Sequence, residues 1–339
     1  MSRMADAFEE AARQRPDEVV ASSLESPAGP IRLTVVGRRL AGHLTGSLGH
    51  LAGPDRPPCF RVDMWDEAVA DVPCRVPTDH AAFPRDVNGT LVRLAPGTPR
   101  RMWTAGQNSV TELDSAEARM VGWRADGSRL SIEERARPFP VALQAWLQSQ
   151  GVVTVHAAAV ACDGRAVLIV GDSGSGKSTT AVACAAAGFG FLGDDQVAVS
   201  DSDGRSVAHS LFASARLDDI VQRVGPAVPH AVHPAPNGAG KSLVLLSGPG
   251  SAVVPSATVA AVIVASVSPR SDSTLVRASA KDALRAMLPS TMLGVVDDRP
   301  TVFRACARIV LGLRAYRLHS GRDLHAVPRL VAQALAESR

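Results

Sequence analysis

Apolar residues in this chain gather in short runs, separated by turns rich in glycine, proline and aspartate. Such runs are typical of strands, whereas apolar residues three or four positions apart are typical of helices. The first third predicts a helical start over about 1–20, a strand at 31–36, a helix at 38–51, and strands at 60–64, 91–94 and 120–124. Turns are expected at Asn88-Gly89 and Asp126-Gly127. The stretch from Asp71 to Arg101 is rich in proline and has little periodicity.

The pattern sharpens after Val152. An apolar strand at 152–161 and a second at 166–170 flank Asp163-Gly164, which is a strong signal for a hairpin. A glycine-rich segment and a helix at 177–187, ended by Gly188, follow. Further expected elements are strands at 189–192, 197–199, 243–246 and 259–267, a loop at 226–240, a helical tail with Val302, Cys306, Ile309 and Leu313 on one face, and a last helix at 327–337.

This succession predicts an α/β protein with a mixed sheet and a smaller N-terminal α+β domain. A helix at 141–150 follows prolines 138 and 140, so we place the boundary there. The expected domains are residues 1–138, which carry no chemical motif and are a candidate for substrate recognition, and residues 139–339, which carry the chemistry.

Composition excludes several classes of protein. The 339 residues are 46% hydrophobic and 20% charged, with a mean hydropathy of +0.07, as in a globular protein with a buried core. Aromatics make up only 4% and the net charge is +3, so we expect no nucleic-acid partner. The polar start and the shortness of the longest apolar run, 259–267, predict a cytoplasmic protein without a membrane partner. Five dispersed cysteines indicate neither a disulfide framework nor a zinc site.

One segment fits the phosphate-binding pattern G-x-x-x-x-G-K-[ST] at every required position. Its glycines let backbone N–H groups curl around a phosphate, and the following helix turns its positive dipole end toward the same anion. The lysine neutralises phosphate oxygens and the next hydroxyl completes a Mg²⁺ shell, so ATP and Mg²⁺ are the expected cofactors. The candidate nucleotide-binding residues are Gly171, Asp172, Ser173, Gly174, Ser175, Gly176, Lys177, Ser178 and Thr179.

Acidic candidates for the metal and for proton transfer come soon after this loop. Asp194-Asp195 follows an apolar segment, where a carboxylate can reach a metal at the loop. A second carboxylate beside it can accept a proton from an attacking hydroxyl. Two rival pairs, Asp218-Asp219 and Asp297-Asp298, suit a helix start and a turn. His156 stands in the apolar strand of the hairpin, where a core role and a role near the phosphates are both open.

The ordered set Val155-His156-Ala157, GDSGSGKST, Ala187-Gly188-Phe189 and Gly193-Asp194-Asp195 resembles the C-terminal kinase domain of the HPr kinase/phosphorylase family. It is most similar to the HPr-kinase-related enzymes of peptide maturation, including lasso-peptide precursor kinases. The resemblance is firm over about 152–200 and looser over 207–330.

This resemblance implies a P-loop kinase domain of the HPr-kinase type that phosphorylates a serine of a peptide or small protein. It implies Asp194 as catalytic base, Lys177 and His156 as catalytic partners, and Ser178 with Asp195 on the metal. The Glu-Ile-Arg-Gly signature of the bifunctional enzymes is missing, so we expect a kinase without efficient phosphorolysis. Arg216 and Arg322 are further candidates for contacts with phosphate or substrate. Homo-oligomerisation, which related kinases show, stays open.

Two other functions stay open on the residues alone: a kinase of a sugar or metabolite alcohol, and an ATP-binding switch without transfer. An ABC-type ATPase is disfavoured because Leu246-Ser247-Gly248-Pro249-Gly250 departs from the LSGGQ signature. A GTPase is disfavoured because no N-K-x-D motif follows the loop. The arginines at 299, 304, 308, 314 and 317 suit either a solvated helix face or a patch for an acidic partner.

Overall fold

The structure is a computed structural model, and it describes residues 2–75, 91–94, 101–106, 108–217, 231–234, 240–248, 250–295 and 298–338. The expected turn at Asn88-Gly89, the pair Asp218-Asp219, Asp297 and most of the expected loop 226–240 lie outside these residues. The chain divides into two compact units, Met1–Gln150 and Gly151–Arg339.

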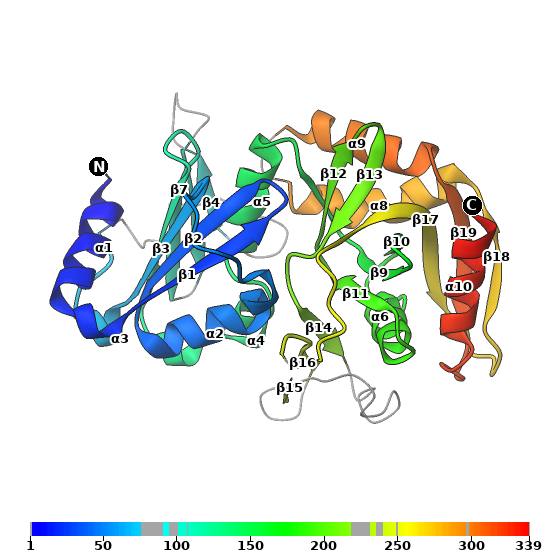
Figure 1. Cartoon of the computed structure of the whole chain (residues 1–339), viewed down its shortest axis with the longest axis horizontal. Helices are drawn as coiled ribbons and strands as arrows, with labels where there is room; N and C mark the ends of the chain where they lie inside the picture. Colours follow the sequence, from blue (N-terminus) through cyan, green and yellow to red (C-terminus); the bar gives the residue numbers. More distant parts are fainter. Residues whose placement is uncertain are drawn as a thin grey trace. The chain divides into compact units, whose positions relative to one another are not determined.

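The first unit is built on a seven-stranded mixed sheet with the order β1-β2-β3-β7-β6-β5-β4 (Figure 1). The pairs β2–β3 and β3–β7 are parallel, and the other pairs are antiparallel. Its elements are α1 (Arg3–Gln14), η1 (Pro16–Glu18), β1 (Val19–Ser26), β2 (Gly29–Val36), α2 (Arg38–Leu48), η2 (Gly49–Leu51), β3 (Phe60–Asp66), α3 (Glu67–Ala70), β4 (Leu91–Leu94), β5 (Arg101–Gly106), β6 (Ser109–Asp114), β7 (Arg119–Arg124), η4 (Gly127–Arg129), α4 (Ile132–Ala136) and α5 (Pro140–Ser149).

Local signals account for most of this unit. Ser2 caps α1 by accepting from the Ala5 N–H, and the buried Met4 and Phe8 of α1 belong to the same core cluster as Trp65. The expected helix over 1–20 stops at Gln14, just before Pro16, and β1 pairs with β2 instead. Strands β5 and β6 were not predicted, because polar residues such as Thr111 and Glu112 interrupt their apolar pattern although they are buried.

Helix α5 belongs to the first unit, whereas the expected boundary at 138 assigned it to the second. The physical reason is a tertiary contact: the Trp146 ring of α5 stacks on Phe60 of β3, with centroids 4.3 Å apart. Both side chains are fully buried, and an aromatic pair of this kind adds to the burial of apolar area.

The second unit contains a nine-stranded mixed sheet with the path β11-β9-β10-β17-β13-β12-β8. Strand β19 pairs with β17, and β18 with β19. A separate sheet has the order β14-β16-β15. The elements are β8 (Val153–Val155), β9 (Ala158–Cys162), β10 (Arg165–Val170), α6 (Lys177–Ala186), β11 (Gly190–Gly193), β12 (Val197–Ser202), β13 (Arg205–His209), β14 (Ser214–Leu217), β15 (Ala231–His233), β16 (Ser242–Leu245), β17 (Ser256–Val267), β18 (Thr274–Ala278), α8 (Ala280–Leu293), α9 (Arg299–Leu311), β19 (Arg314–Ser320) and α10 (Val327–Glu337).

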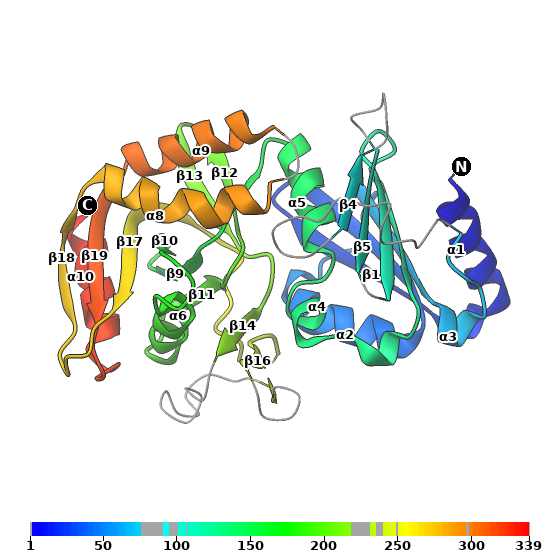
Figure 2. The ribbon, with the colours of Figure 1, turned by 180° about the vertical axis from the view of Figure 1, so that it is seen from behind.

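Helices cover both faces of this sheet. Val167 and Ile169 of β10 pack in one core cluster with apolar residues of α6 and α10. Leu168 and Val170 pack on the opposite face with residues of α8 and α9. Figure 2 shows this face of the sheet, with α8 next to β17 and α9 beside α8. The alternation follows from the period of two along a strand. The chain is therefore a mixed α/β protein, as predicted.

The predicted hairpin forms, since β9 and β10 pair antiparallel around Asp163-Gly164, both in the left-handed region. Two expectations are wrong. The single strand at 152–161 is broken at His156-Ala157, with β8 pairing to β12 and β9 to β10. The tail is not wholly helical, because 314–320 forms β19 and pairs parallel with β17 along its length.

Candidate functional site

The glycine-rich loop connects the end of β10 to the start of α6. Gly171, Gly174 and Gly176 have φ values of 147°, 79° and 94°, which side-chain-bearing residues rarely adopt. A Cβ at Gly171 would lie 2.7 Å from Ser175 Oγ and 2.9 Å from the backbone oxygen of Ala265. Glycine is therefore required at 171 both by conformation and by space.

Gly171→Ala is expected to weaken the binding of inorganic tripolyphosphate and of ATP about tenfold, equivalent to about 1.4 kcal/mol. The added methyl group forces the loop away from Ala265, and the curl of its backbone is lost. The matched control is Gly164→Ala, which also has positive φ (73°) but has open space and lies in the hairpin turn. Isothermal calorimetry measures the affinity of both variants for each ligand. Equal affinities of Gly171→Ala and Gly164→Ala would show that the loop is not the phosphate site.

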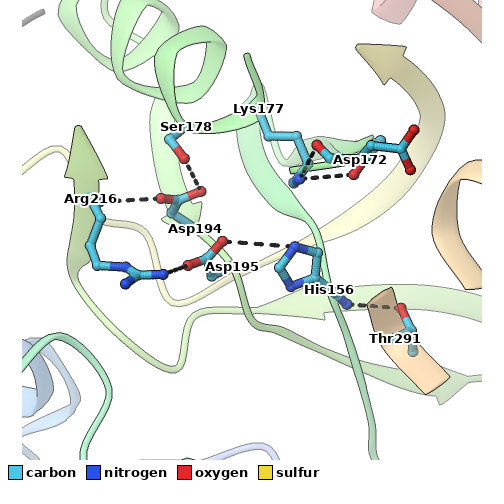
Figure 3. Close-up of polar contacts among 9 residues, drawn as sticks. His156, Asp172, Lys177, Ser178, Asp194, Asp195, Arg216 and Thr291 are labelled. Atoms are coloured by element: carbon cyan, nitrogen blue, oxygen red, sulfur yellow. Dashed lines mark hydrogen bonds and ion pairs between the residues drawn. The ribbon is translucent and has the colours of Figure 1, made fainter. Parts of the chain in front are cut away.

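Lys177 begins α6 and lies back over its own loop. Its Nζ donates to the carbonyl oxygens of Gly171 at 2.8 Å and Asp172 at 3.0 Å (Figure 3). The residue is 5% exposed. Burial lowers the pKa of Lys177 below its ordinary value, while the carboxylates of Asp195 and Asp194 oppose that change. The lysine thus holds a position at the mouth of the loop with no side-chain partner there among the described residues.

Asp194, which follows β11, lies beside Ser178 in the first turn of α6. The Ser178 hydroxyl donates to Asp194 Oδ1 at 2.9 Å, and the backbone N–H of Arg216 donates to Asp194 Oδ2 at 3.4 Å. Asp194 is only 3% exposed. Burial, and then the charge of Asp195, raise the pKa of Asp194 to about 6, although the Ser178 hydrogen bond works in the other direction.

Asp195 turns away from Ser178 toward two basic side chains. Its backbone is left-handed, with φ of 64°, so its side chain leaves the chain in a different direction from that of Asp194. Arg216 Nη2 lies 3.0 Å from Asp195 Oδ2, and His156 Nε2 lies 3.8 Å from Asp195 Oδ1 (Figure 3). Arg216 therefore contacts both aspartates, one with its backbone and one with its guanidinium.

His156 is positioned by the break between β8 and β9. Its backbone N–H donates to Thr291 Oγ1 of α8 at 3.0 Å, in place of a partner in the sheet. Thr291 is buried and lies 135 positions later in the chain, so no local signal in the sequence could have found it. The predicted set His156, Lys177, Ser178, Asp194 and Asp195 is thus assembled around one point.

The remaining candidates lie outside this cluster of five side chains. Asp298, from a rival acidic pair, caps α9 by accepting from the Thr301 N–H. Asp172 and Ser173 are exposed on the loop, and Thr179 is half-buried in α6. Arg322 lies after β19, away from the aspartates in sequence and sheet order. Two of the tail arginines make separate contacts, Arg308 with Asp201 of β12 and Arg304 with Thr301 in its own helix.

Two kinds of feature are absent from the described residues. No group of three or more His, Cys, Asp or Glu side chains in the described ranges is arranged to hold a metal ion. No helix in the part of the chain that the structure describes is long and apolar enough to cross a membrane.

Comparisons with known proteins add little to this picture. No protein-family model matches the chain, and none of the curated proteins is similar to it. Among solved structures, the chain is similar to the Hpr(Ser) kinase/phosphatase from Coxiella burnetii, with 15% identity and a TM-score of 0.27. The similarity covers 54% of this chain and 94% of that chain. Because this likeness is slight, the functional conclusion rests on the site itself.

Proposed function

We propose that this protein is an ATP-dependent kinase of the HPr-kinase type that phosphorylates a serine hydroxyl of a peptide or small protein. The observation that carries this proposal is the contact between Ser178 and Asp194. It brings an acidic pair to the first turn of the helix that follows a glycine-rich loop. Phosphate binding and proton acceptance, the two needs of phosphoryl transfer to an alcohol, then meet at one place.

The loop and Lys177 supply phosphate binding. The loop's backbone amides and the N-terminus of α6 favour an anion at this position. Lys177 now donates to two loop carbonyls, which are weak partners for a buried ammonium compared with a phosphate oxygen. We infer that its Nζ turns from these carbonyls to the β- and γ-phosphate oxygens when ATP binds.

The residues also fit Mg²⁺. The Ser178 hydroxyl and a carboxylate are hard oxygen donors, and Mg²⁺ is usually held by one or two carboxylates together with substrate phosphates. When bound, the metal would neutralise charge on the transferring phosphoryl group. Ser178 and Asp194, which already contact each other, are the side chains that would hold it.

The contacts support a definite division of roles between the two aspartates. Asp194 already accepts from Ser178, so we assign Asp194 to the metal with Ser178. The Asp195 side chain is 17% exposed and can touch an incoming hydroxyl, whereas Asp194 is almost wholly buried. We therefore assign proton acceptance to Asp195, positioned by Arg216 and His156. The resemblance implied the opposite division, and single variants distinguish the two.

Transfer then proceeds in line. The acceptor oxygen forms a bond to the γ-phosphorus as the bond to the β–γ bridging oxygen breaks, and ADP leaves with that electron pair. The hydroxyl proton passes to the carboxylate of Asp195. The resemblance over 152–200 supports a ribosomal precursor peptide as the acceptor, and the first unit is the proposed site of its recognition.

Intact-mass analysis of precursor peptides encoded beside this gene, incubated with Mg-ATP and the purified protein, tests the proposal. We expect a mass gain of one phosphoryl group on a serine, absent with the Asp195→Asn variant. If no peptide gains mass but a sugar or other metabolite alcohol is phosphorylated, the acceptor assignment is wrong. If ATP binds and no acceptor is modified, the protein is a nucleotide-binding switch.

A further inference from the structure

Five strand ends meet at the edge of the second unit's sheet that carries the glycine-rich loop. Strands β10, β17 and β19 are parallel, so their carboxyl ends share this edge. Strand β9 runs antiparallel to β10 and therefore begins there, just after His156. Strand β11, antiparallel to β9, ends there, and Asp194-Asp195 follow directly. The order along the edge is acidic pair, His156, glycine-rich loop, end of β17 and end of β19.

In this order the acidic pair and His156 lie on one side of the glycine-rich loop, and the ends of β17 and β19 lie on the other. In phosphoryl transfer the attacking and leaving oxygens are roughly in line, so the acceptor and the nucleoside diphosphate lie on opposite sides of the γ-phosphoryl group. The acidic pair marks the acceptor side. The nucleoside must then lie on the other side, over the ends of β17 and β19. Ligands of open α/β sheets commonly bind at the carboxyl ends of the strands, which is the edge described above.

We propose that Val267, the last residue of β17, is the apolar floor of the nucleoside subsite, an inference that rests on the proposed kinase function. Val267 is 64% exposed although it ends a strand whose preceding residues, Ala261 to Ala265, are buried. A Cβ at Gly176 would lie 3.5 Å from Val267 Cγ2, so the valine borders the last glycine of the loop. An exposed valine beside a phosphate loop offers the apolar contact that a nucleoside needs.

Backbone contacts join the loop that follows Val267 to the loop that follows β19. The backbone N–H of Ser268 donates to Ser320 O at 2.8 Å, and that of Arg322 donates to Arg270 O at 3.0 Å. Gly321 packs so closely that an added Cβ would overlap the carbonyl oxygens of Ser271 and Asp272. The backbone hydrogen bond between Arg322 and Arg270 places these two exposed residues next to each other. Guanidinium planes stack on aromatic rings, which suits the base of a nucleotide.

The test compares two probes, ADP and inorganic tripolyphosphate, by calorimetry on the full chain. Val267→Ser is expected to weaken ADP binding about fivefold, because part of the apolar contact with the nucleoside is lost. Tripolyphosphate has no nucleoside, so its binding is expected to stay within about twofold of the wild-type value. The control is Val276→Ser, an exposed valine (49%) on β18 of the same sheet, which should change neither affinity. Thermal melting confirms that both variants are folded.

Each other outcome overturns the inference in a recognisable way. Unchanged ADP binding in Val267→Ser shows that the nucleoside lies elsewhere, while the kinase proposal stands. Equal loss for both probes shows that Val267 acts on the phosphates through the loop and not on the nucleoside. If the wild-type protein binds neither probe, the proposed function fails, and the subsite fails with it.

Discussion

Replacing Asp194 or Asp195 with asparagine is expected to lower the rate of phosphoryl transfer by about a hundredfold to ten-thousandfold. The two variants should differ in their response to metal. Asp194→Asn removes the charge beside Ser178. We therefore expect the affinity of this variant for Mn²⁺ to fall at least about tenfold, as measured by electron paramagnetic resonance with ADP present. Asp195→Asn should keep that affinity within about twofold, because Asp195 contacts Arg216 and His156 instead.

Folding is checked by thermal melting. The melting temperature of Asp194→Asn should be no lower than that of the wild type at pH 7. Burial of the charged carboxylate is unfavourable, which is why the pKa of Asp194 is raised to about 6, and a neutral asparagine avoids that cost. Asp203→Asn, an isosteric change in the exposed turn between β12 and β13, is the control and should leave transfer and metal affinity intact. If Asp195→Asn loses metal and Asp194→Asn keeps it, the division of roles implied by the resemblance is correct and ours is wrong.

Lys177→Ala is expected to damage both binding and transfer. The ammonium group is the cation at the mouth of the loop, and without it the β- and γ-phosphate oxygens lose a charge-assisted hydrogen bond. We expect ATP affinity to fall about tenfold and the transfer rate by about a thousandfold, since charge on the γ-phosphoryl group grows in the transition state. Calorimetry and single-turnover kinetics measure the two effects separately.

Two further variants sharpen the lysine experiment. Lys177→Arg should restore little activity, because the planar guanidinium does not fit a buried space shaped for a compact ammonium. Lys281→Ala removes an exposed lysine from α8 and should have no effect. Full transfer by Lys177→Ala would show that the glycine-rich loop is not where the γ-phosphate lies.

Much of the second unit follows from local pattern. The hairpin around Asp163-Gly164, the helix from Lys177 and the final helix from Val327 to Glu337 form where the sequence predicts them. In each case the signal is short-range: a turn that needs left-handed residues, glycines before a helix, or a proline at a helix start. The expected strand at 31–36 and the helix that follows it also form, and β1 completes the pair through a tight hairpin.

Elements whose pattern depends on distant partners were missed. The pattern of the tail predicts helix, but residues 314–320 form β19, because their parallel partner β17 lies about 50 positions earlier in the chain. Strands β5 and β6 carry polar residues that pair across the sheet, such as Thr104 with Thr111, and so lack the apolar alternation of a half-buried strand. Helix α5 was assigned to the wrong side of the boundary for the same reason, since only the stacking of Trp146 on Phe60 reveals its place.

The sequence by itself determined which residues make up the glycine-rich loop, because its glycines, lysine and serine must follow one another in one contiguous segment. It also showed that Asp194-Asp195 follow soon after that loop, whereas it left a core role and a role near the loop both open for His156. Only the tertiary structure decided which aspartate faces Ser178 and which faces Arg216 and His156. That choice depends on the left-handed backbone at Asp195, on a strand break held by Thr291, and on β14 carrying Arg216 to the pair. These contacts join residues far apart in the chain, and such contacts exist only once the sheet and its helices have packed.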